Sequence, residues 1–347
     1  MTDGSRKRKV RGSQIRSSHE EKQRQRTQHR EDKKLERLNK QHGGRRQEPP
    51  TDRDVNFTPE EQLFIKTDAI KQVQTRMERW LDVGRPVHVI GPTGSGKTSL
   101  AMHVARERDC PVVWINGDAE LTTSDLVGEY AEKERISERD KFIHNVVKSK
   151  DIIRDRWVDN PLTLAVQEGA TLVYNEFSRT KPVANNVLLS VFEEGVLELP
   201  GKRGESRYVD VHPEFRAILT SNSVEYAGVH EPQDALLDRL IGIYMDFYDL
   251  ETEIEIVQAH VEKPGSAEIE QIVRVMRELR EGLDITVGTR AAIMAAEGAT
   301  TVDTLDQAIL ADICTDVLAS KVAQRSDVHD LRNDIETIFD EMGASHS

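Results

Sequence analysis

The chain has 347 residues and a formal net charge of −13, and 37% of its residues are hydrophobic, enough for one large or two modest globular units. No apolar run approaches the length of a membrane span, and the basic N-terminus lacks an apolar segment, so neither a transmembrane helix nor a secretory signal is predicted. Cys110 and Cys314 have no metal-like spacing, and we expect two buried, reduced thiols in a cytoplasmic protein.

Charge is divided unevenly along the chain. Residues 1–50 contain 16 basic and 7 acidic side chains, a net of +9, and the rest of the chain therefore carries −22. Only 11 of the 32 basic residues after position 50 are lysines. An acidic surface that is poor in lysine is typical of proteins from salt-loving organisms, where concentrated salt screens the repulsion between like charges. An ordinary acidic surface is the plainer alternative.

Residues 1–50 contain no aromatic residue and few large aliphatic ones. They cannot bury enough apolar surface to offset chain entropy, so we predict a basic, disordered tail. Such a tail can bind nucleic acid or an acidic protein surface, or it can be a solvating extension only. No helix-turn-helix, zinc site or row of aromatic residues accompanies it, which argues against a nucleic-acid motor or loader.

Residues 51–250 alternate short apolar runs with helical patterns. The helical stretch KTSLAMHVARER places Leu100, Ala101, Val104 and Ala105 on one face. Strands that alternate with helices predict an α/β core, with a mostly parallel sheet covered by helices on both faces. The runs that predict strands are VHVIG (87–91), PVVWING (111–117), TLVYNE (171–176), FRAILTSN (215–222) and GIYMDF (242–247).

Two further segments have distinct patterns. GVLELPGKRGESRYVDV (195–211) places two strand-like runs around a Gly-rich basic turn, which predicts a hairpin. It either projects toward a substrate or central pore or is a simple surface hairpin. After residue 250 strand signals fade, and residues 251–347 are predicted to form a smaller all-helical subdomain. The apolar residues that recur at helical spacing are Ile269, Ile272, Val273, Met276 and Leu279 in one helix, and Leu305, Ile309, Ile313 and Val317 in another.

The segment GPTGSGKT matches the phosphate-loop pattern G-x-x-x-x-G-K-[ST] in full, after a predicted strand and before a predicted helix. Glycines let backbone N–H groups turn toward phosphate oxygens, and the helix N-terminus adds the positive end of its dipole. Lys97 can reach the β- and γ-phosphates, and Thr98 can bind magnesium. The candidate nucleotide-binding residues are Gly91, Pro92, Thr93, Gly94, Ser95, Gly96, Lys97 and Thr98.

The run TLVYNE ends in Asn175 and Glu176, where a strand can deliver a carboxylate beside the γ-phosphate. Glu176 is the candidate general base that orients and deprotonates water. Asn175 stands where an Asp normally helps to hold magnesium. Its amide can accept a hydrogen bond from a magnesium-bound water but brings no negative charge, so we expect weaker magnesium binding. A strand end that turns into solvent is the alternative.

Three more polar residues are candidates for the same site. Asn222 ends the next predicted strand and can contact the γ-phosphate or the attacking water, although Asn is also a common turn residue there. Arg239 lies late in a predicted short helix, from which it can reach a neighbouring subunit's nucleotide. Arg290 starts a helix of the C-terminal subdomain and can contact phosphates. Surface salt bridges are the alternative for both arginines.

The order of these motifs resembles an AAA+ ATPase of the MoxR group over about residues 57–325. Within that group, the segment NEFSRTKPVANNVLLSVFEEGVLELPG (175–201) is particularly similar to the gas-vesicle branch. The NorQ/CbbQ branch also looks similar to this chain. The motifs that carry the resemblance are GPTGSGKT (91–98), DLVGEY (125–130), RDRWVDNPLTLAVQEGATLVYNEFSRT (154–180), FEEGVLELPG (192–201), FRAILTSNSVEYAGVHEPQDALLDRL (215–240) and GTRAA (288–292).

The resemblance implies a P-loop AAA+ core followed by a helical lid, with ATP and magnesium (Mg2+) as cofactors. Glu176 would be the base, Asn222 the first sensor and Arg290 the second sensor. Arg239 would be the arginine finger that completes a site between subunits, because such ATPases usually act as rings, often hexamers. Asn175 departs from the family's Asp, which puts the hydrolysis rate and the magnesium affinity in doubt more than nucleotide binding.

Three functions follow from these expectations. The first is an ATPase that assists gas-vesicle assembly, in the cytoplasm or on the vesicle, by remodelling or recruiting other gas-vesicle proteins. The second is NorQ/CbbQ-like activation of a metalloenzyme or of Rubisco, together with a partner that carries a von Willebrand A domain. The third, motivated by Asn175, is a nucleotide-binding assembly scaffold with little turnover.

Overall fold

The computed structural model describes residues 64–140, 148–202, 204–222, 230, 232–282, 286–302, 305–322 and 325–344. The predicted basic tail, residues 1–50, lies outside these ranges, and its disorder stays a prediction.

A five-stranded sheet forms the centre of the N-terminal part. Every pair of neighbouring strands is parallel, as the alternation of apolar runs and helical patterns predicts. The sheet order is β2-β5-β8-β1-β9. The strands are β1 (Val87–Gly91), β2 (Val112–Asn116), β5 (Thr171–Asn175), β8 (Arg216–Asn222) and β9 (Ile241–Tyr244).

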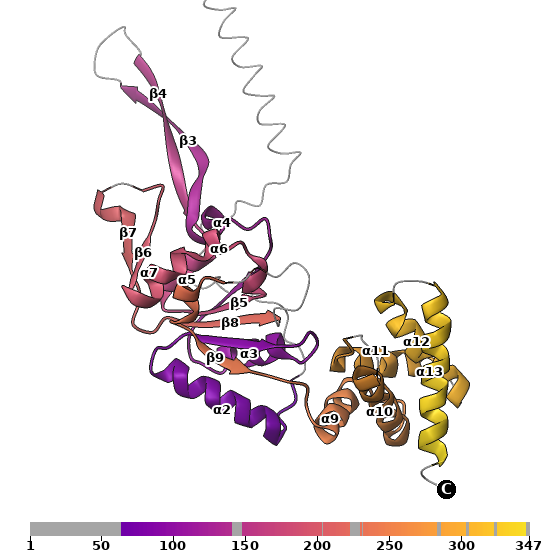
Figure 1. Ribbon diagram of the computed structural model, residues 1–347. Helices are drawn as coiled ribbons and strands as arrows, with labels where there is room; N and C mark the ends of the chain where they lie inside the picture. Colours follow the sequence, from indigo (N-terminus) through magenta and orange to yellow (C-terminus); the bar gives the residue numbers. More distant parts are fainter. Residues whose placement is uncertain are drawn as a thin grey trace, which may run out of the picture. The chain divides into compact units, whose positions relative to one another are not determined.

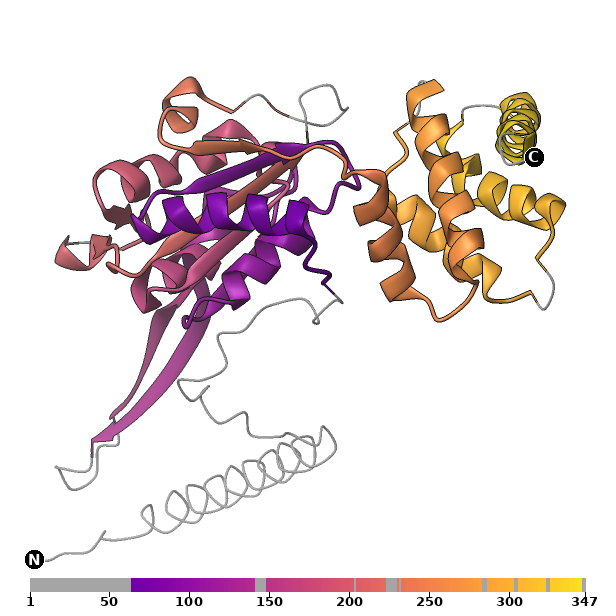
Figure 2. The same cartoon turned by 90° about the horizontal axis from the view of Figure 1, so that it is seen from below.

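Both faces of the sheet are covered, as expected. Side chains alternate across a strand, so Leu172 and Tyr174 pack into one hydrophobic cluster while Val173 packs into another. The cluster on one side contains helices α2 (Asp68–Asp82) and α3 (Lys97–Arg106), which lie together against the strands in Figure 2. On the other side lie α4 (Thr123–Val127), α5 (Pro161–Glu168) and α7 (Val187–Glu193).

Local signals set where several helices begin. Thr67 caps α2 by accepting a hydrogen bond from the N–H of Ile70, and Thr122 and Asp125 form a capping box at α4. Pro161 opens α5, where its missing N–H costs no intrahelical bond. The remaining short elements of this part are η1 (Phe177–Arg179), α6 (Pro182–Asn185) and α8 (Asp234–Leu237).

Two antiparallel hairpins leave this core, and both are visible in Figure 1. The first, β6 (Val196–Glu198) with β7 (Tyr208–Asp210), confirms the predicted hairpin, and the 3₁₀ turn η2 (Gly204–Arg207) lies between its strands. The second is a long ribbon of β3 (Gly128–Asp140) and β4 (Lys148–Asp159), which we did not predict from the sequence. Its charge-rich stretch lacks the apolar runs that identified the buried strands.

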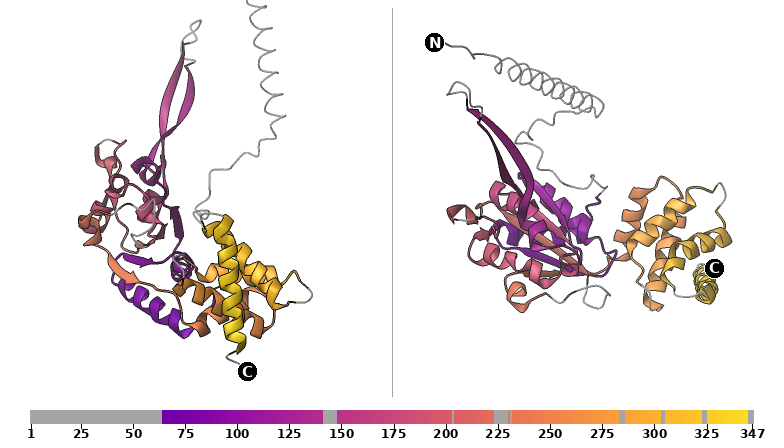
Figure 3. Two further views of the ribbon diagram at one scale, coloured as in Figure 1. Left: turned by 45° about the vertical axis from the view of Figure 1, so that its right-hand side comes forward. Right: turned by 90° about the horizontal axis from the view of Figure 1, so that it is seen from above.

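After residue 250 every described element of secondary structure is a helix, as predicted (Figure 3). One hydrophobic cluster holds these helices together, and its members all come from residues 250–339. Among the helices of the described residues, none combines the length with the apolar composition that a membrane span needs. The elements are α9 (Leu250–His260), α10 (Ser266–Gly282), α11 (Thr289–Ala299), α12 (Gln307–Leu318), η3 (Ala319–Lys321) and α13 (Arg325–Ala344).

The apolar residues noted at helical spacing are fully buried in α10 and only partly buried in and just before α12, where Leu305, Ile313 and Val317 pack against the hydrophobic cluster. In α10 all five are buried. In α12 the fully buried side chains include Leu310, Cys314 and Leu318, whereas Ile309, Ile313 and Val317 are only partly buried. Leu305 is also only partly buried and precedes the helix. Apolar residues lie on two adjacent stripes of this helix, so periodicity alone does not select between them.

The two cysteines also differ from each other. Cys314 is buried in the helical cluster, and burial raises the pKa of its thiol to about 12. Cys110 is only partly buried, which corrects the expectation of two buried thiols. Both are free.

Candidate functional site

Parallel strands deliver the candidate residues to one edge of the sheet. Gly91 at the end of β1 is in register with Asn222 at the end of β8, and Asn116 at the end of β2 is in register with Asn175 of β5. In open parallel sheets ligands bind outside the carboxyl ends of the strands. The phosphate loop, Asn175, Glu176 and Asn222 therefore share the edge at which such a sheet binds its ligand.

The phosphate loop connects β1 to α3. Gly94 and Gly96 have φ angles of 86° and 85°, a left-handed conformation that disfavours side chains, so the two glycines shape the turn. The Ser95 hydroxyl donates to the carbonyl oxygen of Pro92 within the loop. Because α3 begins at Lys97, the unpaired N–H groups of its first turn face the same side as the loop.

Lys97 links the loop to the tip of β8. Its ammonium donates to the Pro92 carbonyl oxygen at 2.8 Å and to Asn222 Oδ1 at 3.0 Å. Only 5% of the residue is exposed. Burial lowers the pKa of Lys97 from 10.5 to about 8, with Glu176 acting to raise it and Arg290 to lower it. The site thus holds a poorly solvated cation that an anionic ligand would stabilise.

This depressed pKa predicts a pH dependence of nucleotide affinity. Phosphate favours the protonated lysine, so binding is tightest below pH 8 and weakens as Lys97 loses its proton in the free protein. We expect the Kd for ATP to rise about tenfold between pH 7.5 and 9. Isothermal titration in concentrated KCl measures it. Lys97→Arg is the control, because a guanidinium stays charged and its Kd should be flat over this range. An equal rise in the arginine variant would contradict the assignment.

Asn175 is held in one orientation by three polar neighbours. Its Oδ1 accepts hydrogen bonds from the hydroxyl groups of Thr98, at 2.6 Å, and Thr220, at 2.9 Å. Its Nδ2 donates to Asn116 Oδ1 at 2.8 Å. The amide oxygen therefore points toward Thr98, the candidate magnesium residue. Asn116 is not among the residues predicted from the sequence, although, like Asn222, it is a polar residue at the carboxyl end of a strand.

Glu176 follows β5 in a strained backbone conformation. Its φ of 53° is the only positive φ of a non-glycine residue in the described ranges, and such strain is found where the surroundings enforce it. Its carboxylate accepts hydrogen bonds from Asn222 Nδ2 at 3.0 and 3.1 Å and lies 3.5 Å from Arg179 Nε. The Glu176 N–H donates to Thr220 Oγ1 at 3.2 Å. Asn222 consequently contacts both Lys97 and Glu176.

A cavity of about 390 Å³ lies beside the phosphate loop. Its size falls within the usual range for ligand pockets, and Gly94, Ser95 and Gly96 form one wall. Thr289 and Arg290, at the start of α11, line it as well, so the structure places Arg290 beside the phosphate loop. Most of the other residues that line the cavity are apolar or aromatic, the kind of surface against which a planar nucleobase packs. They are Phe64, Ile65, Ile70, Tyr248, Ile256 and Ile293.

Arg239 lies apart from this group. It follows α8, which ends at Leu237, so its predicted place within a helix is wrong. It precedes by two residues the start of β9, where Ile241 is in register with Val87 of β1. Arg239 is thus near the amino ends of the strands, opposite the edge that carries the phosphate loop, and pairs with Glu193. It cannot join the site of its own chain.

Thr98 and Asn175 provide oxygen atoms of the kind that a hard cation such as magnesium binds. Thr98 Oγ1 and Asn175 Oδ1 are neutral oxygen donors 2.6 Å apart, and oxygen is the ligand atom that magnesium prefers. Neither donor carries a charge, so phosphate oxygens would have to supply most of the negative charge around such an ion.

Comparison with known proteins agrees with this geometry. Residues 86–240 match the AAA domain family, dynein-related subfamily. The chain is 81% identical over 342 residues to gas vesicle ATPase GvpN1 of Halobacterium salinarum, with 99% of each chain covered. It belongs to the gas vesicle ATPase family. Gas vesicle ATPase GvpN of Haloferax mediterranei is 76% identical, with 97% of each chain covered. GvpN of Ancylobacter aquaticus is 42% identical, with 75% of this chain and 74% of the relative covered.

Proposed function

We propose that the chain binds and hydrolyses ATP at the carboxyl edge of its sheet. One observation carries the proposal: Asn222 contacts both the phosphate-loop lysine, Lys97, and the carboxylate of Glu176. A phosphate-binding cation and a carboxylate that share one amide are close enough to act on the two sides of a terminal phosphate.

The phosphate loop and Lys97 hold the triphosphate. Backbone N–H groups around Gly94 and Gly96 face phosphate oxygens, and Lys97 neutralises charge on the β- and γ-phosphates. Thr98 and Asn175 are the residues that would hold Mg2+, through the Thr98 hydroxyl and the Asn175 amide oxygen. When bound, magnesium neutralises charge that develops on the phosphates.

Glu176 acts as the general base. Its carboxylate orients a water molecule and accepts a proton as the oxygen attacks the γ-phosphorus. Asn222 donates to this carboxylate and fixes its direction, and it is also the residue from which γ-phosphate can be sensed. The strained backbone at Glu176 follows the end of β5, and the carboxylate contacts Asn222 at the end of the neighbouring strand β8.

Two arginines complete the site from different directions. Arg290 belongs to the helical lid, residues 251–347, and reaches the phosphates of the nucleotide bound to its own subunit. It can do so because it lines the same cavity as the phosphate loop. Arg239, at the opposite edge of the sheet, serves a neighbouring subunit as an arginine finger. An arginine that acts on the nucleotide of the next subunit requires a head-to-tail oligomer. We propose that this oligomer is a ring, with a hexamer as the expected size.

The biological role that we propose is that of a MoxR-group ATPase that assists gas-vesicle assembly in the cytoplasm by remodelling or recruiting other gas-vesicle proteins. The motif set and the similarity to gas vesicle ATPases over the full chain support it. The NorQ/CbbQ-like alternative has no comparable support among these relatives.

A deletion strain tests this role. A strain that lacks the gene should lose buoyant vesicles, and the unaltered chain, but not Lys97→Ala or Glu176→Gln, should restore them. Full complementation by the Glu176→Gln chain would indicate a nucleotide-binding scaffold. Normal vesicles in the deletion strain would contradict a gas-vesicle role.

A further inference from the structure

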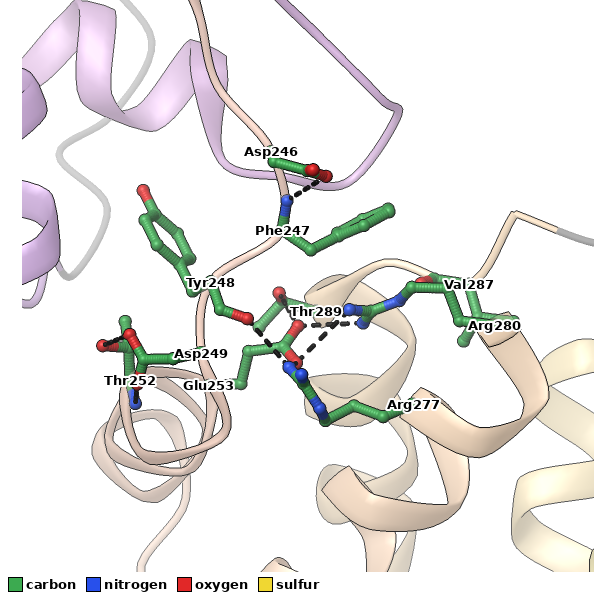
Figure 4. Close-up of polar contacts among 10 residues, drawn as sticks. All are labelled: Asp246, Phe247, Tyr248, Asp249, Thr252, Glu253, Arg277, Arg280, Val287 and Thr289. Atoms are coloured by element: carbon green, nitrogen blue, oxygen red, sulfur yellow. Dashed lines mark hydrogen bonds and ion pairs between the residues drawn. The ribbon is translucent and has the colours of Figure 1, made fainter. Parts of the chain in front are cut away.

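A buried carboxylate lies at the base of the helical lid. Glu253 of α9 is 1% exposed, and three side chains donate hydrogen bonds to it (Figure 4). Arg277 donates to Oε2 at 2.7 Å, while Arg280 and Thr289 donate to Oε1 at 2.9 and 2.8 Å. Both oxygens are therefore occupied, as a buried charge requires.

The same cluster contacts the connecting segment, residues 245–249, which joins β9 of the sheet to α9 of the lid. Arg277 Nη1 also donates to the backbone carbonyl of Tyr248 at 2.8 Å. The guanidinium of Arg280 lies 3.9 Å from the centre of the Phe247 ring, and its Nε donates to the Val287 carbonyl at 2.5 Å. Figure 4 shows Glu253 between the two arginines and Thr289, with Phe247 and Tyr248 above. Through its two arginines the cluster thus joins Phe247 and Tyr248 to Val287, just before α11.

Thr289 belongs both to this cluster and to the lining of the cavity beside the phosphate loop. It is the first residue of α11, adjacent to Arg290, and both line the cavity beside the phosphate loop. A side chain built on Gly94 would come within 3.0 Å of the backbone of Gly288, so the backbone just before α11 runs close to the loop. The hydrogen bond from Thr289 to Glu253 consequently fixes the first turn of the helix that carries Arg290.

Stability alone does not explain a buried carboxylate here. Replacing buried ion pairs with well-packed apolar side chains is often neutral or stabilising, because desolvation offsets the attraction between charges. What the ions add is geometry, since each hydrogen bond restricts the direction of its partner.

We propose that Glu253 is a positioning residue for Arg290. It sets where that guanidinium meets the nucleotide's phosphates, and through Arg277 it ties this position to the connecting segment at Tyr248. The proposal rests on the proposed nucleotide site. According to this proposal, the same hydrogen-bond cluster controls both the position of the lid and the binding of phosphate.

A double-mutant cycle on the full chain tests it. The variants are Glu253→Gln, Arg290→Ala and the two combined, and the measurement is the Kd for ATP beside kcat and KM for phosphate release. Glu253→Gln should weaken ATP binding about tenfold, the order expected for disturbed hydrogen bonds to a charged group. In the Arg290→Ala background the same change should have no further effect, because Glu253 acts through Arg290.

Two further variants separate positioning from folding. Thr289→Val removes a single hydrogen bond and should raise the Kd in the same direction, whereas Thr289→Ser should restore it. Glu270→Gln breaks the exposed pair with Arg274 on α10 and should leave the Kd unchanged. Thr289→Val decides the matter if Glu253→Gln does not fold.

Three outcomes would overturn the proposal. In the first, Glu253→Gln and Thr289→Val bind ATP like the unaltered chain. In the second, the effects of Glu253→Gln and Arg290→Ala multiply, so that Glu253 acts independently of Arg290. In the third, the unaltered chain binds no ATP, which removes the proposed function together with this inference and is distinguishable from the first two.

Discussion

Glu176→Gln is expected to lower ATP turnover by about 100-fold or more, because removal of a general base typically costs that much. Gln keeps the size of the side chain and still offers an oxygen to Asn222 Nδ2, which lies 3.0 Å from the carboxylate. It cannot accept the proton of the attacking water. Nucleotide binding should survive, since the phosphate loop and Lys97 are untouched. Steady-state phosphate release measures turnover, and fluorescence titration with a labelled nucleotide measures binding.

The matched control is Glu168→Gln, at the exposed end of α5. It makes the same chemical change on the same part of the chain and should leave turnover within twofold of the unaltered protein. If Glu176→Gln kept more than half of the turnover, the base would have to be another group, and the strained conformation at position 176 would need another explanation.

Lys97→Ala should greatly reduce the stabilisation that ATP gives to the fold. A ligand present at 100 times its Kd stabilises the native state by about 2.7 kcal/mol, and loss of the phosphate-binding cation should remove most of that. In the absence of nucleotide the variant should be no less stable than the parent, because Lys97 is a buried cation whose pKa is lowered by desolvation. Thermal unfolding with and without ATP, in concentrated KCl, measures both effects.

Lys71→Ala is the control for this experiment. Lys71 is an exposed lysine of α2 that pairs with Asp68 on the surface, so its loss should leave the ATP-dependent rise in Tm intact. A rise of normal size in the Lys97→Ala variant would show that Lys97 is not needed to hold the triphosphate, and the phosphate loop would lose its assigned role.

Local sequence patterns predicted the features that depend on neighbours in the chain. The phosphate loop is a continuous segment whose glycines and lysine have positions set by the turn itself, so Gly94, Gly96 and Lys97 lie where the pattern predicts. Alternation of apolar runs with helices predicted the parallel sheet, and a parallel sheet brings its carboxyl ends together. For this reason Asn175, Glu176 and Asn222 could be proposed as neighbours before the fold was known.

Contacts between distant segments were not predictable in this way. Asn116 and Thr220 hold Asn175 from two other strands, and nothing in their local sequences says which partner they meet. Glu253 and Arg280 are 27 positions apart on different helices. The sequence alone therefore suggests that each charge lies on a solvent-exposed helix face, and only the packing of the helices shows that they meet. The fully buried face of α12 depends on which neighbouring helices cover it, and periodicity alone does not select it from the adjacent apolar stripe.

Steady-state phosphate release by the unaltered chain, with ATP and magnesium in concentrated KCl, tests most directly whether an amide at position 175 suffices for hydrolysis. The hydrogen bonds that aim the Asn175 oxygen at Thr98 predict sustained turnover, with Asn175→Asp strengthening magnesium binding rather than creating activity. If the unaltered chain bound ATP and released no phosphate, and Asn175→Asp started turnover, the hydrolase assignment would be wrong. The protein would then be a nucleotide-gated assembly factor.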